Sequence, residues 1–522
     1  MQPGPAGANR QRGGTVHGNA PFSTFPTPAP RSMTVLHIAA EMAPLAKVGG
    51  LADVVGALPD ALAAIGVQSS VLMPLYGGPD GEVAQRAGPL TESASGHVTY
   101  GGQTLGYTVF RATDAEGADV YLLHQPEHFG SGGAYFDVGN VPFANADDRF
   151  PAFQLCALDW LATALAGTDR QPDVLHLHDH HTGLIPALAA HDGRFAALRD
   201  TPTVFTIHSA DHQGWAPWHV WEKTGASVPD AHTFQQNGDT LNAMRAALRF
   251  ADRITTVSPT YAQELQASDE MAHGLADAFR QRAESFSGIV NGVDGADWDP
   301  STDRLLPATY SADDLAGKAE TKRAVCAELG LDPSRPLVTF VGRLTREKGA
   351  EILKGLVWRL LDETDAAFAL LGSGAPEHED GLRHLDHHAA STGRRDRLSV
   401  TLAFDNALAH RLYAAGDLFL MPSRSEPCGL GQLYAMAYGT PPVVHAVGGL
   451  RDTVIPWDGR EGTGFTFDAF TEDAAAHATR AALAVAADEA SYCTLQQNAM
   501  AADHSWAASA ERYAALYREA VR

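Results

Sequence analysis

Short apolar runs alternate with longer amphipathic stretches along most of the chain. The runs at 35–39, 337–341 and 418–421 are bounded by polar or turn-forming residues, which is typical of strands buried in a parallel sheet. Further strands are expected at 288–293, 367–371 and 442–445, and the stretch 77–150 is expected to be loop-rich, with strand-like runs at 105–111 and 120–124. After Leu51, apolar side chains recur at helical spacing until Gly66, where a helix would end. The succession of strand, loop, helix and strand predicts βαβ units and therefore an α/β protein.

The first βαβ unit carries a glycine pair where its helix begins. Lys47 stands just before Gly49 and Gly50, and Asp53 lies in the first turn of the helix. Bare backbone N–H groups at the positive end of a helix suit an anion, and a lysine beside them favours that interpretation over a solvated side chain. The spacing does not match the G-x-G-x-x-G fingerprint, which disfavours an enzyme that uses a nicotinamide dinucleotide.

A second unit of the same kind spans residues 417–454. Glu426 lies in the loop after the strand at 418–421, and Gly448 and Gly449 open the helix that follows the next strand. A glycine pair is more often a plain turn and a loop glutamate is usually solvated, so each feature alone is weak evidence. Ligands of parallel sheets bind at the carboxyl ends of strands. The two features on successive strands therefore indicate a carboxylate and a phosphate site over one cleft.

Two cations follow the strand at 337–341. Arg343 offers a bidentate fork and Lys348 a point charge, so one loop could clamp a diphosphate. The chain has 38 basic and 62 acidic residues, a formal net charge of −24, which argues against nucleic acid or an anionic membrane as partner. In so acidic a chain, cations placed at a strand end favour a local anionic ligand, and sugar-nucleotide chemistry fits.

Length and composition set the organisation of the chain. At 522 residues two or more domains are expected, and the acidic, turn-rich segment 294–314 is the best boundary. Four widely spaced cysteines indicate a reducing compartment and neither a disulfide framework nor a zinc site, and no apolar run approaches a membrane span. Residues 1–31 are rich in Pro, Gly and Ala, which predicts a disordered tail or a true start at Met33.

A histidine cluster and a tryptophan-rich stretch each allow two interpretations. His176, His178 and His180 alternate along a predicted strand and could bind a metal ion, but the sequence indicates no further ligands, so a metal site is disfavoured. Tryptophans at 215–221 could form a platform for sugar rings or pack into the core.

Together these motifs resemble the glycogen/starch synthases of glycosyltransferase family 5. The similarity runs from about Thr34 to the C-terminus and rests on KVGGLAD at 47–53, Asp179 with His181, His208 with Gln213 and Gly214, residues 343–349, and EPCGL at 426–430. Related nucleotide-sugar transferases often carry a second glutamate at the position that Tyr434 holds here, which favours family 5.

The resemblance implies an α/β protein of GT-B architecture, with two Rossmann-like domains facing a deep interdomain cleft. It implies a final helix that crosses back to the first domain. The expected divisions are a disordered tail (1–32), an acceptor-side domain (33–293), a nucleotide-sugar-binding domain (294–504) and the crossover helix (505–522).

The activity implied is retaining transfer of glucose from ADP-glucose to the non-reducing end of an α-1,4-glucan, which elongates glycogen. Neither a metal nor pyridoxal phosphate is implied, and the partners are ADP-glucose and glycogen, with no nucleic acid or membrane and with room for a homo-oligomer. A bacterial-type cytoplasmic location is expected, with plastid import of a starch synthase as the weaker alternative. Two functional alternatives stay open: a catalytically impaired homologue that binds glucan or nucleotide sugar, and the same reaction with UDP-glucose.

The family's site residues carry over to matching positions. Arg343 and Lys348 would stabilise the departing diphosphate, Glu426 would bind the glucose, and His208 would contact it and offer its backbone carbonyl to the oxocarbenium-like centre. Retention without an obvious nucleophile suggests departure and attack on one face. The substrate-binding residues implied are Lys47, Gly49, Gly50, Asp53, Asp179, Ser209, Gln213, Cys428, Gly429, Leu430, Gly431, Gly448 and Gly449.

This sequence departs from the family pattern at several positions near the motifs. Ser209 replaces the usual Asn, and its shorter side chain has less reach toward a sugar. Gly431 stands where Thr is common but keeps the backbone N–H, and Ser425 and His180 replace aromatic residues.

Overall fold

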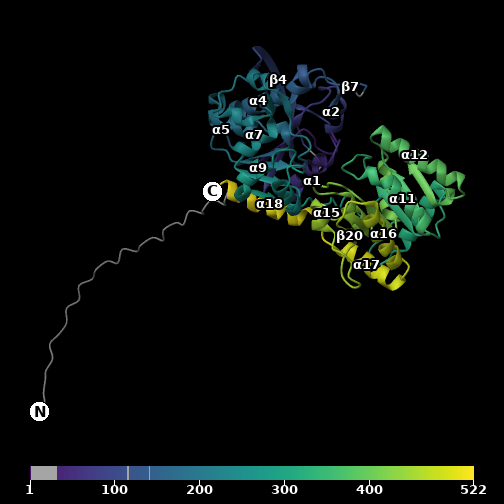
Figure 1. Ribbon diagram of the computed structural model, residues 1–522. Coiled ribbons are helices and arrows are strands. Elements are labelled where there is room, and N and C mark those ends of the chain that lie inside the picture. Colours follow the sequence, from purple (N-terminus) through teal and green to yellow (C-terminus); the bar gives the residue numbers. More distant parts are fainter. Residues whose placement is uncertain (2–31, 114–116, 140) are drawn as a thin grey trace. The chain divides into compact units, whose positions relative to one another are not determined.

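Two separate sheets hold the apolar runs of the sequence (Figure 1). The structure, a computed structural model, describes residues 1, 32–113, 117–139 and 141–522. Within them, the larger sheet has the strand order β14 (Phe286–Gly288), β13 (Arg253–Thr256), β9 (Thr203–Ile207), β8 (Val174–His178), β1 (Thr34–Ile38), β2 (Gln68–Pro74), β5 (Asp119–His124), β4 (Gln103–Thr113) and β3 (Thr91–Tyr100). Strands β14 to β5 are parallel, and the β5–β4–β3 edge is antiparallel.

The smaller sheet is parallel throughout. Its order is β17 (Leu398–Thr401), β16 (Ala367–Leu371), β15 (Leu337–Val341), β18 (Leu418–Met421), β19 (Pro442–His445) and β20 (Phe465–Phe467). All side chains of β16, β18 and β19 are buried, because helices cover both faces of a parallel sheet. Short antiparallel pieces, β10 (Trp215–Pro217) with β11 (Gln235–Gln236) and β12 (Thr240–Asn242), and β6 (Phe136–Asp137) with β7 (Val141–Pro142), lie outside these sheets.

Helices connect the parallel strands, as βαβ units require. Those of the first half are α1 (Gly50–Ala64), α2 (Glu82–Ala87), α3 (Pro126–Phe129), α4 (Ala146–Trp160), α5 (Ile185–His191), α6 (His219–Lys223), α7 (Ala243–Phe250), α8 (Pro259–Ala267) and α9 (Ala276–Gln281). Those of the second half are α10 (Ala316–Leu329), α11 (Ala350–Glu363), α12 (Pro376–Ser391), α13 (Asn406–Ala415), α14 (Gly431–Ala437), α15 (Gly448–Thr453), α16 (Glu472–Ala486), α17 (Glu489–Ala501) and α18 (Trp506–Ala520).

The last helix, α18, packs on the first half of the chain, as predicted. Its buried Tyr513 and Tyr517 share one apolar cluster with Val54 and Leu58 of α1. The start of α18 lies close to the backbone at Gly292, where an added Cβ would lie 2.5 Å from the backbone of Trp506. The packing of α18 against the first half of the chain therefore depends on glycine at position 292.

Two expectations about strands are wrong. The strand expected at 288–293 ends at Gly288 as β14, since a Cβ there would lie 2.1 Å from the carbonyl oxygen of Ser258 and the chain then turns toward α18. The stretch 77–150, expected to be loop-rich, contains the long strand β3. Its polar sequence TESASGHVTY, in which only two of ten side chains are buried, forms the outer edge of the sheet, so hydropathy gave no strand signal.

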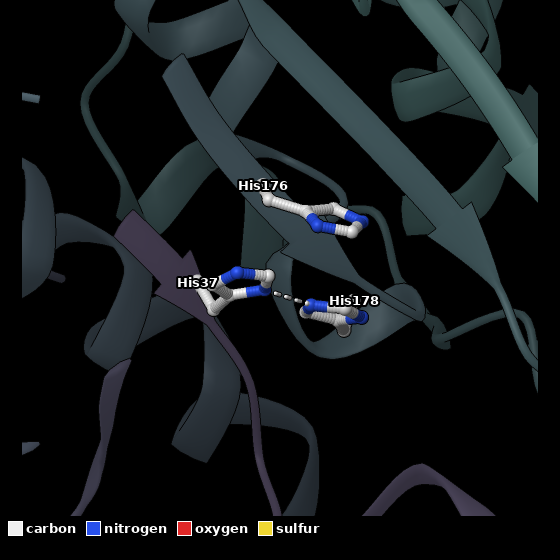
Figure 2. Close-up of side chains that lie close together, drawn as sticks. All are labelled: His37, His176 and His178. Carbon is white, nitrogen blue, oxygen red and sulfur yellow. Dashed lines mark hydrogen bonds between the residues drawn. The ribbon is translucent and has the colours of Figure 1, made fainter. Parts of the chain in front are cut away.

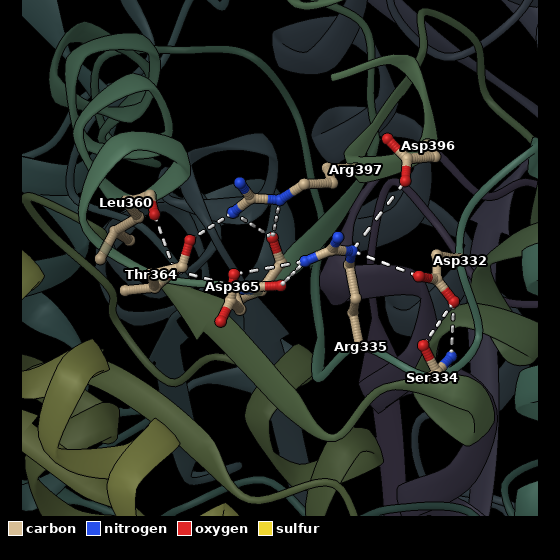
Figure 3. A network of polar contacts seen from close by, with 9 residues as sticks. Asp332, Ser334, Arg335, Leu360, Thr364, Asp365, Asp396 and Arg397 are labelled. Atoms are coloured by element: carbon tan, nitrogen blue, oxygen red, sulfur yellow. Dashed lines mark hydrogen bonds and ion pairs between the residues drawn. The ribbon is translucent and has the colours of Figure 1, made fainter. Parts of the chain in front are cut away.

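A polar network links the amino-terminal ends of three strands of the smaller sheet (Figure 3). Arg335, just before β15, donates to the carbonyl of Asp365 at 3.2 Å and pairs with Asp332 at 3.3 Å. Arg397, just before β17, donates from Nε to the carbonyl of Ala366 at 3.2 Å. These ends are opposite the carboxyl ends of the strands, so the network stabilises the sheet and lies away from the expected ligand site.

Met33–Arg522 form one compact unit. The predicted tail, 1–32, lies outside the described residues except for Met1 and Ser32, and the domain boundaries at 293/294 and 504/505 stay predictions. Among the helices of the described residues, none has the length and apolar character needed to cross a bilayer.

Candidate active site

The loops after β15 and β18 meet because these strands are neighbours in the smaller sheet. Gly349 closes the first loop with φ +74°, and a Cβ there would lie 1.9 Å from the carbonyl oxygen of Pro422 in the second. This approach brings Lys348 Nζ within 2.5 Å of Glu426 Oε2, which also accepts a hydrogen bond from Ser423 Oγ at 3.0 Å. The structure therefore pairs the predicted phosphate cation with the predicted sugar carboxylate.

Arg343 stands on the same loop as Lys348 but has a different environment. Its side chain is exposed and forms no ion pair with any residue in the described ranges. Lys348 is held by Glu426, with 23% of its side chain exposed. The loop thus offers one free guanidinium and one ammonium already positioned by a buried carboxylate, which suits an anion bound across both.

The Gly448–Gly449 turn packs tightly against the Glu426 loop. A Cβ at Gly448 would lie 2.0 Å from the carbonyl oxygen of Glu426, and one at Gly449 would lie 2.0 Å from that of Cys428. Gly448 N donates to Glu264 Oε1 at 3.0 Å, and Gly449 N donates to the carbonyl of Glu426 at 3.1 Å. Both amides have protein partners in this structure, so close packing accounts for the glycines and their phosphate contact stays a prediction.

The Lys47 loop surrounds a buried carboxylate that the sequence did not single out. Glu41, only 3% exposed, accepts from the amides of Val48 at 2.6 Å and Gly49 at 3.0 Å, and from the hydroxyl of Tyr135. Lys47 Nζ pairs instead with Asp53 at 2.6 Å. Glu41 follows the carboxyl end of β1, which is the only signal in the sequence that could have identified it.

The Lys47 loop and the Glu426 loop come close to each other. A Cβ at Gly50 would lie 3.7 Å from Leu430 Cδ1, an ordinary contact distance. Leu430 therefore lies within contact distance of the first glycine pair.

A second contact across the halves is reciprocal, because each half supplies a carboxylate. Asp452 accepts from Ser258 Oγ at 2.6 Å and Thr260 N at 2.9 Å, whereas Glu264 of α8 accepts from Gly448 N. Burial raises the pKa of Glu264, and the amide of Gly448 opposes that shift. Sequence patterns assign no role to Glu264, Ser258 or Thr260, since these contacts join residues far apart in the chain.

Asp179 and His208 lie side by side because β8 and β9 pair in parallel. Asp179 adopts φ +54°, a left-handed conformation uncommon outside glycine, and its Oδ1 accepts from the backbone N–H of His208 at 2.8 Å. Burial raises the pKa of Asp179 to about 7, although the backbone N–H groups of His208 and Ser209 oppose the shift by favouring the charged form. The pair thus joins a carboxyl that titrates near neutrality to the predicted sugar-contacting histidine.

Gln213 and Ser209 lie differently from each other in the loop after β9. Gln213 is fully buried: its Nε2 donates to the carbonyls of Ala210 and Ala272, and its Oε1 accepts from Asn242 Nδ2 at 2.7 Å. A sugar contact would have to break these bonds, so the geometry gives Gln213 a supporting position beneath the loop. Ser209 is half-buried, and its Oγ accepts from Asp211 N at 3.2 Å.

The residues after Glu426 form a tight entry to α14. Cys428 is buried, and burial raises the pKa of its thiol to about 12, so it is not a nucleophile. Gly429 has φ +76°, and a Cβ there would lie 2.3 Å from Gln432 Oε1. Gly431 faces Phe419, while Leu430 is half-buried. The backbone of this segment is thus fixed by its glycines.

Most residues of the tryptophan-rich stretch and of the histidine cluster pack against other side chains of the protein. Trp221 is buried, whereas Trp215 is 44% exposed and donates from Nε1 to Gln236 Oε1. His180 lies beyond β8, at the start of a 3₁₀ turn, and is not part of the cluster of His176 and His178. The third histidine of that cluster is His37 of β1.

Comparison with known proteins decides the family. Residues 34–281 match the model of the starch synthase catalytic domain, and residues 322–495 match that of glycosyl transferases group 1. A glycogen synthase of Anaeromyxobacter sp. is 42% identical over 498 residues, which cover 93% of this chain and 99% of the relative. This chain belongs to the glycogen/starch synthase family. A glycogen synthase of Streptococcus mutans is 39% identical, over 93% of this chain and 100% of the relative.

Solved structures agree with this family assignment. The catalytic domain of starch synthase IV from Arabidopsis thaliana, bound to ADP and acarbose, aligns with a TM-score of 0.83 and 32% identity, over 94% of this chain and 100% of that one. Sucrose-phosphate synthase from Thermosynechococcus elongatus aligns with a TM-score of 0.57 and 20% identity, over 93% and 98%, which bears on the fold alone. The GT-B fold predicted for this glycogen/starch synthase relative is confirmed.

Proposed function

We propose that this protein is a glycogen synthase that transfers glucose from ADP-glucose to the non-reducing end of an α-1,4-glucan with retention of configuration. The observation that carries the proposal is the Lys348–Glu426 pair, with the exposed Arg343 on the same loop. Cations for a diphosphate and a carboxylate for a sugar thus meet at the carboxyl ends of adjacent strands. The relatives that bear the name glycogen synthase align over almost their whole length.

Charge explains how this group of residues would promote transfer. As the glycosidic bond breaks, negative charge grows on the diphosphate and positive charge on the sugar. Lys348 and Arg343 would stabilise the first, and the carboxylate of Glu426 the second. Because Lys348 and Glu426 already hold each other in place, little reorganisation is needed when the charges develop.

We infer that the reaction needs neither a metal ion nor pyridoxal phosphate. Arg343, Lys348 and, from the first half of the chain, Lys47 supply the positive charge that a diphosphate leaving group requires. The proposal of ADP over UDP is supported by the starch synthase IV structure, which is bound to ADP. A cytoplasmic location and a homo-oligomer remain predictions of the sequence.

The test compares nucleotide release from ADP-glucose and from UDP-glucose, each with and without glycogen. The proposal expects glycogen-dependent release of ADP at a kcat/KM clearly above that for UDP. Faster release of UDP would overturn the donor assignment. Glucan binding by folded protein without nucleotide release from either donor would favour the impaired homologue instead.

A further inference from the structure

We propose that His178 is a positioning residue that fixes the ring of His208 with its proton on Nδ1, so that His208 donates a hydrogen bond to a hydroxyl of the bound sugar. The proposal rests on the proposed function in one respect, namely that His208 contacts the donor glucose. It adds a residue, a tautomer and a direction of hydrogen bonding to that contact.

A chain of three imidazoles leads from the interior of the larger sheet to the site. Strands β1, β8 and β9 are parallel neighbours, and His37 of β1 lies in register with His176 of β8. His37 Nδ1 lies 3.2 Å from His178 Nε2, the contact drawn in Figure 2, and His178 Nδ1 lies 3.0 Å from His208 Nε2. The chain ends at the histidine whose backbone N–H is held by Asp179.

The cluster is better explained by hydrogen bonding than by a metal ion. Ligand nitrogens of His37, His176 and His178 lie within 4.8 Å of one another, which alone would allow a shared ion. However, His176 Nε2 is bonded to Thr206 Oγ1 at 2.7 Å and its Nδ1 to the hydroxyl of Tyr517 at 2.8 Å. Both nitrogens of His178 are also engaged. A metal ion would have to break bonds at two of its three ligands.

The rings of the chain are neutral near pH 7. Burial lowers the pKa of His37 to about 3 and that of His208 to about 3, and it holds the pKa of His178 well below its usual value. A neutral imidazole has one N–H and one lone pair. Because His178 bonds both neighbours, it donates to one and accepts from the other, so the chain has only two possible directions.

The environment of His37 selects the direction. Its Nε2 is buried and has no hydrogen-bond partner among the described residues. A buried N–H without an acceptor is costlier and rarer than a buried lone pair without a donor. His37 therefore carries its proton on Nδ1 and donates to His178 Nε2. His178 in turn donates from Nδ1 to His208 Nε2.

This direction determines what His208 presents to a ligand. Since Nε2 accepts from His178, the ring proton lies on Nδ1, which bonds to no residue in the described part of the chain. The ring is held at Nε2 and the backbone at its N–H, so the remaining donor has a fixed orientation. The reversed chain would present a lone pair and would suit a hydroxyl donor instead.

The test uses two variants with the same branched side-chain skeleton that differ in hydrogen bonding. His178→Asn keeps an amide donor near the position of Nδ1, whereas His178→Leu has methyl groups in place of the amide and removes the donor. His176→Leu is the control, since His176 is equally buried on the same strand but bonds Thr206 and Tyr517 instead of His208. Nitrogen-15 NMR of histidine-labelled protein reports the His208 tautomer, assigned by its loss in His208→Gln.

We expect protonated Nδ1 and unprotonated Nε2 at His208 in the wild type, in His178→Asn and in His176→Leu, and a mixture of tautomers in His178→Leu. In ADP-glucose kinetics, His178→Leu should lower kcat about 10- to 100-fold relative to His176→Leu, by analogy with metal-bound histidines that lose the group that orients their ring. His178→Asn should recover most of that loss.

A wild-type His208 protonated on Nε2 would overturn the proposal. Equal kcat values and equal tautomers in the Asn and Leu variants would overturn it as well. A folded wild type that shows the Nδ1 tautomer but transfers no glucose would contradict the proposed function and the role of the donor, while confirming the direction of the chain.

Discussion

Replacing Lys348 with Ala should abolish most turnover while leaving the protein folded. Lys348 Nζ lies 2.5 Å from Glu426 Oε2, and their side chains are 23% and 6% exposed, so the ammonium is fixed in a place partly shielded from water. A preorganised group that stabilises charge in the transition state contributes about 2.7–4 kcal/mol. We therefore expect kcat with ADP-glucose and glycogen to fall about 10²- to 10³-fold.

Loss of the ion pair also affects stability, so a matched control is needed. Lys322 pairs with Asp417 at 2.6 Å, with side chains 18% and 19% exposed, but this pair lies where β18 begins, at the opposite end of the strand from Glu426. Each Ala variant leaves a shielded carboxylate without its cation, which costs about 1–3 kcal/mol. Both variants should therefore melt at lower temperature, whereas only Lys348→Ala should lose turnover.

The assay is steady-state ADP release on variants whose folding is verified by circular dichroism. A kcat for Lys348→Ala within a few-fold of that for Lys322→Ala would contradict a role of Lys348 in the transition state. It would mean that Lys348 serves only to neutralise Glu426 and does not act on the diphosphate.

Three further predictions concern neighbouring groups. Glu426→Gln keeps the shape but removes the charge, so kcat should collapse with little change in KM; a raised KM at normal kcat would limit Glu426 to sugar binding. Gly449→Ala places a Cβ 2.0 Å from the carbonyl oxygen of Cys428 and should destabilise the fold by about 1–3 kcal/mol or more in urea titration, whereas Gly193→Ala, with nothing within 4 Å, should not. The pKa of Asp179 is raised from 3.8 to about 7 in the folded protein, so its protonated form favours folding, and that contribution is fully present below pH 3.8 and is lost as pH rises from there through about 7. Between these two pH values the melting temperature of Asp179→Asn should fall less than that of the wild type, and parallel curves would contradict the shift.

Hydropathy predicts the strands of the smaller sheet well, because helices bury both faces of each strand. The apolar runs at 337–341, 367–371, 418–421 and 442–445 coincide with β15, β16, β18 and β19. The polar edge strand β3 gave no such signal, since only two of its ten side chains are buried. Periodicity thus succeeds where both faces are buried and fails at an exposed antiparallel edge.

Several residues of the candidate site could be predicted from the sequence, but the contacts between them could not. Glu426, Lys348 and Asp179 could be placed from the sequence because each follows a strand at its carboxyl end. The pairing of Lys348 with Glu426 depends on the close approach of two loops, which Gly349 allows, and residue types alone do not determine such a contact. The link from His37 to His208 likewise follows from the pairing of three strands, which local sequence does not specify.

Whether the protein is a retaining glucosyltransferase is decided by the product that the wild type forms from ADP-glucose and a short α-1,4-glucan. We predict one ADP released for each glucose added, with every new linkage α-1,4 at the non-reducing end, so that the α configuration of the donor is retained. Formation of β linkages, or no elongation by folded protein at saturating donor and acceptor, would contradict it.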